Sequence, residues 1–358
     1  MVMPNRRGFL AGFMAASLIP RPTWADVGAP AYLSAGALAD GSYVLCGITG
    51  RLEVLFQIPL PDRGHAAAAH PKRPEAVAFA RRPGTFAVVI DCATGKPTAW
   101  MEAPQGRHFY GHGTFSADGR LLYTTENDFD AGEGRIGVWD ATAGYRRVGE
   151  FASGGIGPHD IKRLPERDTL VVANGGIDTH PDTGRSKLNL PTMRPNLSYI
   201  EAGTIIDAVE LNPDAHQNSI RHLAVGRKGE VALGMQWQGE AAPSSLVGIH
   251  SMGQTPQLLD CPPDDLRKMQ GYIGSIALSD DGASIAVTSP RGGLVHIYGA
   301  ASGTLAAVHA AADVSGVAAH PDGFAVTTGT GDLLTIGETG ISRRASGPII
   351  WDNHLVAI

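Results

Sequence analysis

The stretch Arg63-Gly-His-Ala-Ala-Ala-Ala-His-Pro71 contains the pattern from which the architecture follows. Its opening Gly-His returns as Gly111-His112, and single histidines recur at matching places further along the chain. His112 and His222 each stand seven residues before the glycine of a tight turn. With the copies that lack an imidazole, the equivalent places are His65, His112, His159, His222, Ser275, Gly316 and His354. Recurrence at seven places, five of them histidine, predicts seven copies of one structural unit.

The copy that begins at Gly111 shows what this unit is. Its hydrophobic runs predict four strands, at residues 112–116, 121–126, 136–140 and 145–151. Tight turns at Gly119 and Gly144 and a longer loop between them connect these strands. Four short strands in about 40 residues are typical of one blade of a β-propeller.

The two ends of the chain supply the last blade. Six complete copies leave three expected strands near the N-terminus, at residues 32–37, 43–48 and 52–60, and one near the C-terminus, at residues 349–357. Joined, they form a seventh sheet, and a ring closed in this way has no free sheet edges. We therefore predict an all-β fold, a seven-bladed β-propeller closed by N- and C-terminal strands, which occupies residues 26–358 as a single domain.

Short and long connections alternate along each blade and therefore separate onto the two faces of the disk. Short Asp-Gly turns fall on one face. The long loops 127–134, 175–196 and 237–243 fall on the other, together with loops 107–111 and 214–219, which lead into innermost strands. Long loops carry function more often than the strands beneath them. We expect the histidine positions to open on this second face, at the mouth of the central channel.

Residues 1–25 have a different character. The segment Asn5-Arg-Arg-Gly-Phe-Leu10 resembles a twin-arginine export motif, and an apolar run and a small-residue site ending at Ala25 follow it. We predict a signal peptide that is cut near Ala25 and delivers the folded domain to the periplasm. The alternative is a basic N-terminal helix that packs on the domain.

Composition excludes several classes of function. Removal of residues 1–25 takes away Arg6, Arg7 and Arg21 but no acid, so the formal net charge falls from -6 to -9. Such an acidic domain is a poor nucleic-acid binder. The mature chain has no apolar run of about 18 residues, so no transmembrane span is expected. Motifs of serine hydrolases, zinc proteases and nucleotide-binding proteins are absent from the sequence.

The three cysteines, Cys46, Cys92 and Cys261, are far apart in the sequence. None lies in a Cys-x-x-Cys or Cys-x-x-Cys-His motif, which argues against c-type haem and against a thiolate zinc site. Two states stay open: one disulfide with a free thiol, or three thiols.

The repeated histidines are the main functional clue. Innermost strands surround the channel, so His65, His112, His159, His222 and His354 can converge from distant parts of the sequence. Neutral imidazole is the commonest protein ligand for late transition metals. The alternative is that these side chains are structural and hydrogen-bond to neighbouring blades. Because a seven-bladed channel is wide, we expect three or four adjacent imidazoles to share a metal rather than all five.

Other residues are secondary candidates on the same face. His108, His180 and His216 lie in its loops and are further candidate metal ligands. Three arginines that precede or flank ring histidines are candidates for binding an anionic ligand or cofactor: Arg63, Arg107 and Arg221. The alternative is that these arginines pair with acids of the chain.

Six motifs resemble one known family. They are Arg107-His-Phe-Tyr-Gly-His-Gly113, Thr125-Glu-Asn-Asp128, Gly154-Gly-Ile-Gly-Pro-His159, Val172-Ala-Asn-Gly-Gly-Ile-Asp-Thr-His-Pro181, Ser219-Ile-Arg-His222 and Thr288-Ser-Pro-Arg-Gly-Gly293. They make the mature chain similar to the bacterial family catalogued as domain of unknown function 1513. The resemblance implies an exported WD40- and YVTN-like propeller, encoded beside imelysin-type iron-uptake lipoproteins and a protein similar to di-haem oxidoreductases. It implies a setting of envelope iron or metal handling and assigns no residue a role.

These observations give one main hypothesis and two alternatives. We expect a periplasmic propeller that binds a transition metal, iron or copper, at a histidine-lined channel mouth, as an accessory of metal uptake. The first alternative is an interaction scaffold for an imelysin-type partner, in which the histidines are structural. The second is a metal-dependent oxidoreductase or lactonase-like hydrolase, because a metal with an incomplete ligand set activates water. The sequence shows no particular base beside the ring, so whether the protein is an enzyme stays open.

Overall fold

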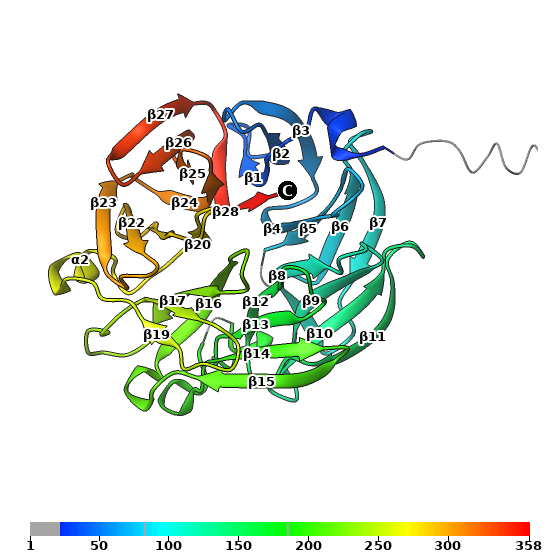
Figure 1. Cartoon of the computed structure of the whole chain (residues 1–358). Coiled ribbons are helices and arrows are strands. Elements are labelled where there is room, and N and C mark those ends of the chain that lie inside the picture. Colours follow the sequence, from blue (N-terminus) through cyan, green and yellow to red (C-terminus); the bar gives the residue numbers. More distant parts are fainter. Residues whose placement is uncertain (1–21, 82–83, 185) are drawn as a thin grey trace, which may run out of the picture.

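Seven four-stranded antiparallel sheets stand around a central axis like the blades of a propeller (Figure 1). This computed structural model describes residues 22–81, 84–184 and 186–358. The innermost strand of each blade contacts the innermost strands of its two neighbours, so these seven strands surround the axis. The seven-bladed β-propeller predicted from the repeat is confirmed.

Each blade has four strands. From the innermost strand outward they are β4 (Gly64–Ala69), β5 (Glu75–Ala80), β6 (Phe86–Asp91) and β7 (Lys96–Glu102); β8 (Arg107–Phe115), β9 (Leu121–Asp128), β10 (Glu133–Asp140) and β11 (Arg146–Ala152); β12 (Pro158–Arg163), β13 (Leu170–Asn174), β14 (Asn196–Glu201) and β15 (Thr204–Glu210); β16 (Asn218–Val225), β17 (Val231–Trp237), β18 (Val247–His250) and β19 (Gln257–Leu258); β20 (Ser275–Leu278), β21 (Ser284–Ser289), β22 (Leu294–Gly299) and β23 (Leu305–Ala310); β24 (Val314–His320), β25 (Gly323–Thr328), β26 (Asp332–Gly337) and β27 (Gly340–Ser346); β28 (Ile350–Ala357), β1 (Tyr32–Ala37), β2 (Tyr43–Ile48) and β3 (Val54–Leu60). The short helices are η1 (Trp24–Val27), η2 (Pro181–Thr183), η3 (Leu190–Thr192), η4 (Pro213–Ala215) and α2 (Pro263–Lys268).

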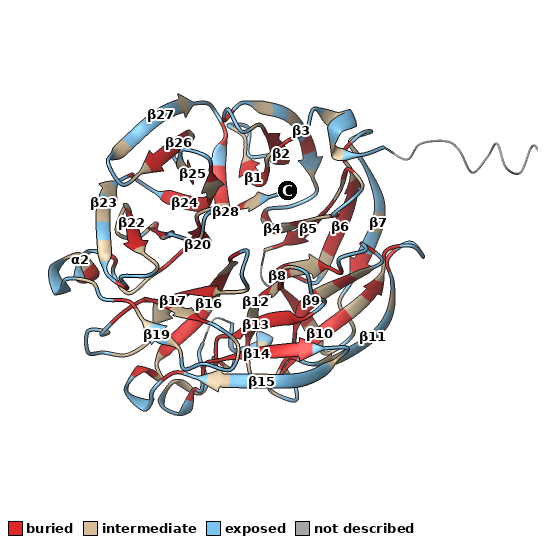
Figure 2. Ribbon diagram, viewed as in Figure 1, coloured by how far each residue is buried: buried red, intermediate tan, exposed pale blue. Residues whose placement is uncertain are grey.

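The hydrophobic core lies between neighbouring blades. The central strand β13 is buried along its whole length, because adjoining blades cover both faces of its sheet. The outermost strand β23 alternates between half-buried and exposed residues, since only one of its faces meets the core. Figure 2 shows the same change from buried centre to exposed rim in the other blades. In one such interface the rings of Phe79, Phe109 and Trp139 pack against one another at an angle, with successive centroids 6.1 and 6.0 Å apart.

The two ends of the chain meet in one blade, as predicted. Strand β28 pairs with β1, with Tyr32 opposite Ala357. The Ser34 hydroxyl donates a hydrogen bond of 2.9 Å to the carbonyl of His354 across this pair. The Tyr32 hydroxyl reaches the next blade and donates to the Ala319 carbonyl at 2.8 Å. The closing contacts therefore join three segments that are distant in the sequence.

Six of the seven innermost strands carry a β-bulge at the repeated position. The strand register shifts between Gly64 and Ala67 on β4, and corresponding shifts occur on β8, β12, β16, β24 and opposite β28. A bulge adds a residue that has no partner on the neighbouring strand and re-aims the side chains around it. Residues 107–111, which we expected to be a loop, belong to β8, because the bulge lets this strand continue past its irregular part.

The N-terminal prediction falls mainly outside the described residues. The export motif and the apolar run lie within residues 1–21, which the description does not cover. Near the expected cleavage site, Trp24 begins η1, and its indole N–H donates to the His70 carbonyl at 2.8 Å. Between residues 22 and 358, no described helix has the length and hydropathy needed to cross a bilayer.

The cysteines are three separate thiols. Cys46 and Cys92 are buried and Cys261 is half-buried, and none forms a disulfide. Burial raises the pKa of the Cys46 thiol and that of the Cys92 thiol to about 12. Of the two states left open by the sequence, the structure has the second.

Candidate metal centre

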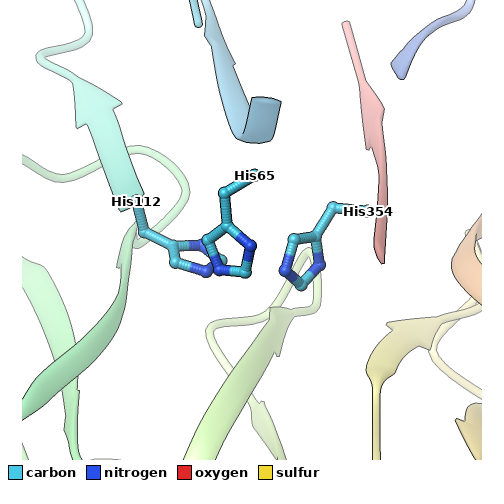
Figure 3. A group of neighbouring side chains, drawn as sticks. All are labelled: His65, His112 and His354. Atoms are coloured by element: carbon cyan, nitrogen blue, oxygen red, sulfur yellow. The ribbon is translucent and has the colours of Figure 1, made fainter. Parts of the chain in front are cut away.

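Five imidazoles converge on the axis of the propeller. They come from the innermost strands of five blades: His65 on β4, His112 on β8, His159 on β12, His222 on β16 and His354 on β28. Eight pairs of these rings have centroids between 4.8 and 6.1 Å apart. Figure 3 shows three of them, which point toward one another from separate strands. We call these five residues the histidine cluster.

Small residues at the two remaining equivalent places leave room for this cluster. Ser275 and Gly316 occupy the positions between His222 and His354 around the ring. A Cβ atom at Gly316 would lie 2.5 Å from the backbone nitrogen of Leu355, so β24 and β28 approach closely there. The rings of His222 and His354 reach across this gap to a centroid distance of 5.1 Å. All five rings therefore gather around the axis, across the two small residues.

The donor atoms fall into two groups that share one residue. His65, His112 and His354 form one group, and His112, His159 and His222 form the other. Within each group the candidate ligand atoms lie within 4.8 Å of one another. A tetrahedral ion with metal–nitrogen distances of about 2.0 Å separates its ligands by about 3.3 Å. Movements of about an ångström would bring three imidazoles onto one ion.

Four ring nitrogens of the cluster are buried without a hydrogen-bond partner among the described residues. They are Nδ1 of His65, Nε2 of His112, Nδ1 of His222 and Nε2 of His354. His320, a buried histidine outside the cluster, differs in this respect. It accepts from the Asp322 N–H at Nδ1, at 3.0 Å, and its Nε2 lies 2.8 Å from the Gly50 carbonyl. His296 and His309, also outside the cluster, each leave a buried Nε2 without a partner among the described residues, but only in the cluster do several such nitrogens lie within reach of one ion.

A close contact of backbone and ring fixes the position of His65. Gly111 has a φ of +97°, a backbone conformation that residues other than glycine rarely adopt. A Cβ atom at this place would lie 2.5 Å from Cδ2 of His65. The Gly-His pair that recurs in the sequence has a physical reason here: the glycine of one blade makes room for the imidazole of the preceding blade.

Burial keeps most of the cluster neutral. Loss of hydration, with the repulsion of nearby cationic groups, holds the pKa of His65, His159 and His354 well below that of a free imidazole. The same causes lower the pKa of His222 to about 3. Metals bind the neutral form of imidazole. At neutral pH, protons therefore do not compete for these nitrogens.

One carboxylate orients the shared histidine. Asp160 is buried, and its Oδ1 lies 3.3 Å from Nδ1 of His112 and 3.1 Å from Nζ of Lys162. Its carboxylate also accepts from the backbone N–H groups of Ile161 and Leu223, at 2.8 and 3.0 Å. Burial acts to raise the pKa of Asp160, but Lys162 and His112 outweigh it and hold that pKa below its ordinary value. A carboxylate at Nδ1 leaves Nε2 of His112 as the donor atom.

Replacement of Asp160 by asparagine is expected to weaken metal binding by about 10- to 100-fold, the usual effect of losing the group that orients a ligating histidine. The amide removes the negative charge that holds the proton on Nδ1 of His112. The affinity for Cu²⁺ should be measured by competition with a chelator of known affinity. The matched control is Asp182→Asn, since the Asp182 side chain is exposed to solvent and lies outside the cluster. Equal affinities of the two variants would show that Asp160 does not orient a ligand.

Three histidines of the cluster are buried within the channel, and His65 and His159 are half-buried. His112, His222 and His354 are 4, 5 and 8% exposed. A cavity of about 540 Å³ begins at these three residues and runs along the later parts of the innermost strands toward the face that carries the short turns. We expected the histidines to open on the opposite face, which carries the long loops, and this stays a prediction; the cavity offers an approach from the other side.

The secondary histidine candidates are not part of the cluster. His108 is buried on β8, with Nδ1 at 3.0 Å from the Phe109 carbonyl and Nε2 at 3.2 Å from the Asn127 amide nitrogen. His180 stands beside η2, with Nε2 3.4 Å from Asp130, and its ring packs against Phe129. His216 is half-buried, and its Nδ1 lies 2.8 Å from the Pro213 carbonyl. These three side chains have partners of their own, away from the axis.

Two of the three candidate arginines pair with acids of the chain. Arg63 holds Asp352 with both ends of its guanidinium, at 2.7 and 3.1 Å. Arg107 pairs with Asp128 at 3.2 Å and also contacts Glu150. Arg221 precedes His222 on β16, and its carbonyl lies 2.9 Å from Nδ1 of His159. The pairing alternative thus describes Arg63 and Arg107, and anion binding by any of the three stays a prediction.

Two residues beside the cluster were not among the site residues predicted from the sequence. Asp160 and Lys162 follow His159 on the same innermost strand, where the other copies carry small or aliphatic residues. A charged pair in a strand that otherwise lines a channel was the available signal. Its meaning depends on contacts with two other blades, which the sequence does not reveal.

Comparison with known proteins gives the family. A family model described as "Protein of unknown function (DUF1513)" matches residues 58–358. The chain belongs to the DUF1513 family. This confirms the resemblance seen in the six motifs. No curated protein sequence matches the chain.

Solved structures share the fold of this DUF1513 member. Hydrazine synthase of Kuenenia stuttgartiensis aligns with a TM-score of 0.58 and 15% identity, over 84% of this chain and 93% of that chain. A chain of a mitotic checkpoint complex aligns with a TM-score of 0.58 and 12% identity, over 79% of this chain and 80% of that chain. At these identities the similarity shows the architecture alone.

Proposed function

We propose that this propeller is an exported protein that holds one transition-metal ion, copper or iron, at the histidine cluster. The observation that supports this most is the set of buried ring nitrogens without partners, on four of the five imidazoles. A buried polar atom without a hydrogen bond costs free energy. A cation bound by these nitrogens offsets that cost.

The donor set favours a late first-row ion. All five candidate ligands are imidazoles, which suit copper, iron and zinc, and Cu²⁺ binds such sites most tightly among the divalent ions. Calcium and magnesium need oxygen ligands. The carboxylate at the cluster, Asp160, already accepts from His112, Lys162 and two backbone N–H groups. We therefore propose that Cu²⁺ is bound more tightly than Fe²⁺ in vitro.

The biological role proposed here is an accessory function in metal uptake. The twin-arginine motif at residues 5–10 supports export to the periplasm. The twin-arginine route carries folded proteins, so the metal would be installed before export. The family resemblance supports a setting beside an imelysin-type iron-uptake protein, which is the proposed partner.

Metal analysis of protein purified without a polyhistidine tag tests this proposal. We expect one equivalent of copper or iron per chain, or uptake of one equivalent when Cu²⁺, or Fe²⁺ without oxygen, is added. The His180→Ala protein should bind the same amount, because His180 lies outside the cluster. A wild-type protein that carries no stoichiometric metal and takes up neither Cu²⁺, Fe²⁺ nor Zn²⁺ would refute the proposal. Co-precipitation with the imelysin-type protein would then examine the scaffold alternative.

A further inference from the structure

Small side chains line the cavity beside the histidine cluster and leave it open. It has a volume of about 540 Å³, within the range of sites for small molecules. Residues 66–69 place four consecutive alanines along one side of it, and Ala224, Ala277 and Ala318 line others. Channels of this width are easily filled by larger side chains, so the run of alanines leaves space that a ligand can use.

This cavity ends on the candidate metal ligands. His112, His222 and His354 belong to its lining, as does Asp160 behind His112. An ion held by three imidazoles keeps at least one further coordination position, because four is its usual minimum. The cavity is lined by two members of each donor group, His112 with His354 and His112 with His222, so an ion held by either group is within reach of the cavity.

A single ammonium group stands at the meeting point of cavity and cluster. Lys162 lines the cavity, and its Nζ lies 3.1 Å from Oδ1 of Asp160. The side chain is 38% exposed, and an ammonium group has three donors, of which Asp160 takes one. Since the carboxylate of Asp160 is also held by two backbone N–H groups, Lys162 can serve a second anion without leaving the first.

We propose that the cavity receives a small anionic ligand, a carboxylate or an inorganic anion, which coordinates the histidine-bound metal directly and pairs with Lys162. This inference rests on the proposed metal binding. It adds that the ion is reached from the face with the short turns and that the protein binds the metal and an anion together. The walls of small apolar side chains accommodate the non-ionic part of such a ligand.

Azide is a suitable probe, because it is small and anionic and its binding to Cu²⁺ produces a charge-transfer absorption band. Wild-type protein loaded with one equivalent of Cu²⁺ is expected to give a saturable band on titration with azide, and formate, acetate and phosphate should compete with it to different degrees. The copper content of every variant is measured first, and azide affinities are compared at full loading.

Two variants test the charge of Lys162 and the volume of the cavity separately. Lys162→Gln should weaken azide binding by about fivefold or more, the effect of one partly screened charge pair. Lys228→Gln, at an exposed turn, is the matched control and should bind azide like wild type. Ala224→Phe, two residues after His222 on the same side of β16, should fill the cavity and abolish the band.

The outcomes distinguish this inference from the proposed function. If the wild-type protein binds no copper, both fail. If it binds copper but gives no azide band, the metal carries no accessible position, and only the anion site is refuted. An azide affinity that neither Lys162→Gln nor Ala224→Phe alters would also refute it, since azide would then reach the ion by another route.

Discussion

Replacement of His112 by alanine is expected to lower the affinity for Cu²⁺ by at least about 100-fold, more than any other single substitution in the cluster. His112 is the residue that both donor groups share, so its loss leaves neither group with three imidazoles. Removal of a residue that only orients a ligand costs about 10- to 100-fold, and loss of the ligand itself costs more. Competition with a chelator, followed by spectroscopy of bound copper, measures this affinity.

Two comparisons make this result specific. His159→Ala removes a ligand from one group and leaves His65, His112 and His354 intact, so its loss should be smaller. His216→Ala removes a half-buried imidazole outside the cluster and should leave the affinity for Cu²⁺ unchanged. Circular dichroism establishes that each variant is folded. If folded His112→Ala protein bound copper as tightly as His216→Ala protein, the histidine cluster would not be the metal site.

Acidification is expected to destabilise the metal-free protein strongly, by roughly 5 kcal/mol between pH 7 and pH 5.5. Four histidines have a folded-state pKa far below the unfolded value near 6.5: His65, His159, His222 and His354. Below that pH the unfolded chain binds protons at these histidines and the folded chain does not. The free energy of unfolding therefore falls as pH falls. Each histidine contributes up to about 1.4 kcal/mol per pH unit, and for His222 the window extends down to about pH 3.

Urea unfolding at a series of pH values, with a chelator present, measures this dependence. The His222→Asn protein should lose stability less steeply below pH 6.5. The variant lacks one of the histidines that bind a proton in the unfolded chain but not in the folded one. His216→Asn, which changes an imidazole outside the cluster, should retain the wild-type slope. A wild-type stability that stays constant between pH 7 and 5.5 would mean that the imidazoles are not buried in the neutral form. Saturation with metal should raise the stability at pH 7 by mass action.

The architecture was predictable because it is periodic. The repeated histidine places, the tight turns and the two incomplete ends predicted seven blades and their closure, and β1, β2 and β28 lie within a residue of the expected bounds. Periodicity constrains which positions are equivalent, and equivalence around an axis places them on one ring. Convergence of the five histidines was therefore a consequence of the fold class.

The direction and depth of the side chains were not predictable in this way. Each imidazole is aimed by a β-bulge, which depends on extra residues in the pairing with the neighbouring strand, as between Phe109 and Gly113 on β8. Strand alternation alone leaves open whether His112 faces the axis or a neighbouring blade. The sequence therefore predicted the ring of histidines but not how deeply each imidazole is buried.

The surroundings of the cluster depend on contacts between blades. Asp160 touches His112 of the preceding blade and the Leu223 backbone of the following one. The cavity arises where alanines of several blades face each other across the axis. The charged pair at Asp160 and Lys162 and the alanine run 66–69 are visible in the sequence, but the contacts that give them meaning are not. Arg63 shows the same limit, since its partner Asp352 comes from the other end of the chain.

X-ray absorption spectroscopy of copper-loaded protein tests the central claim most directly, because it counts the atoms bound to the ion. The histidine cluster predicts three or four nitrogen ligands at about 2.0 Å, with the outer-ring scattering of imidazole, and loss of this signal in His112→Ala. A shell of oxygen atoms without imidazole scattering, or a spectrum that His112→Ala leaves unchanged, would contradict the account.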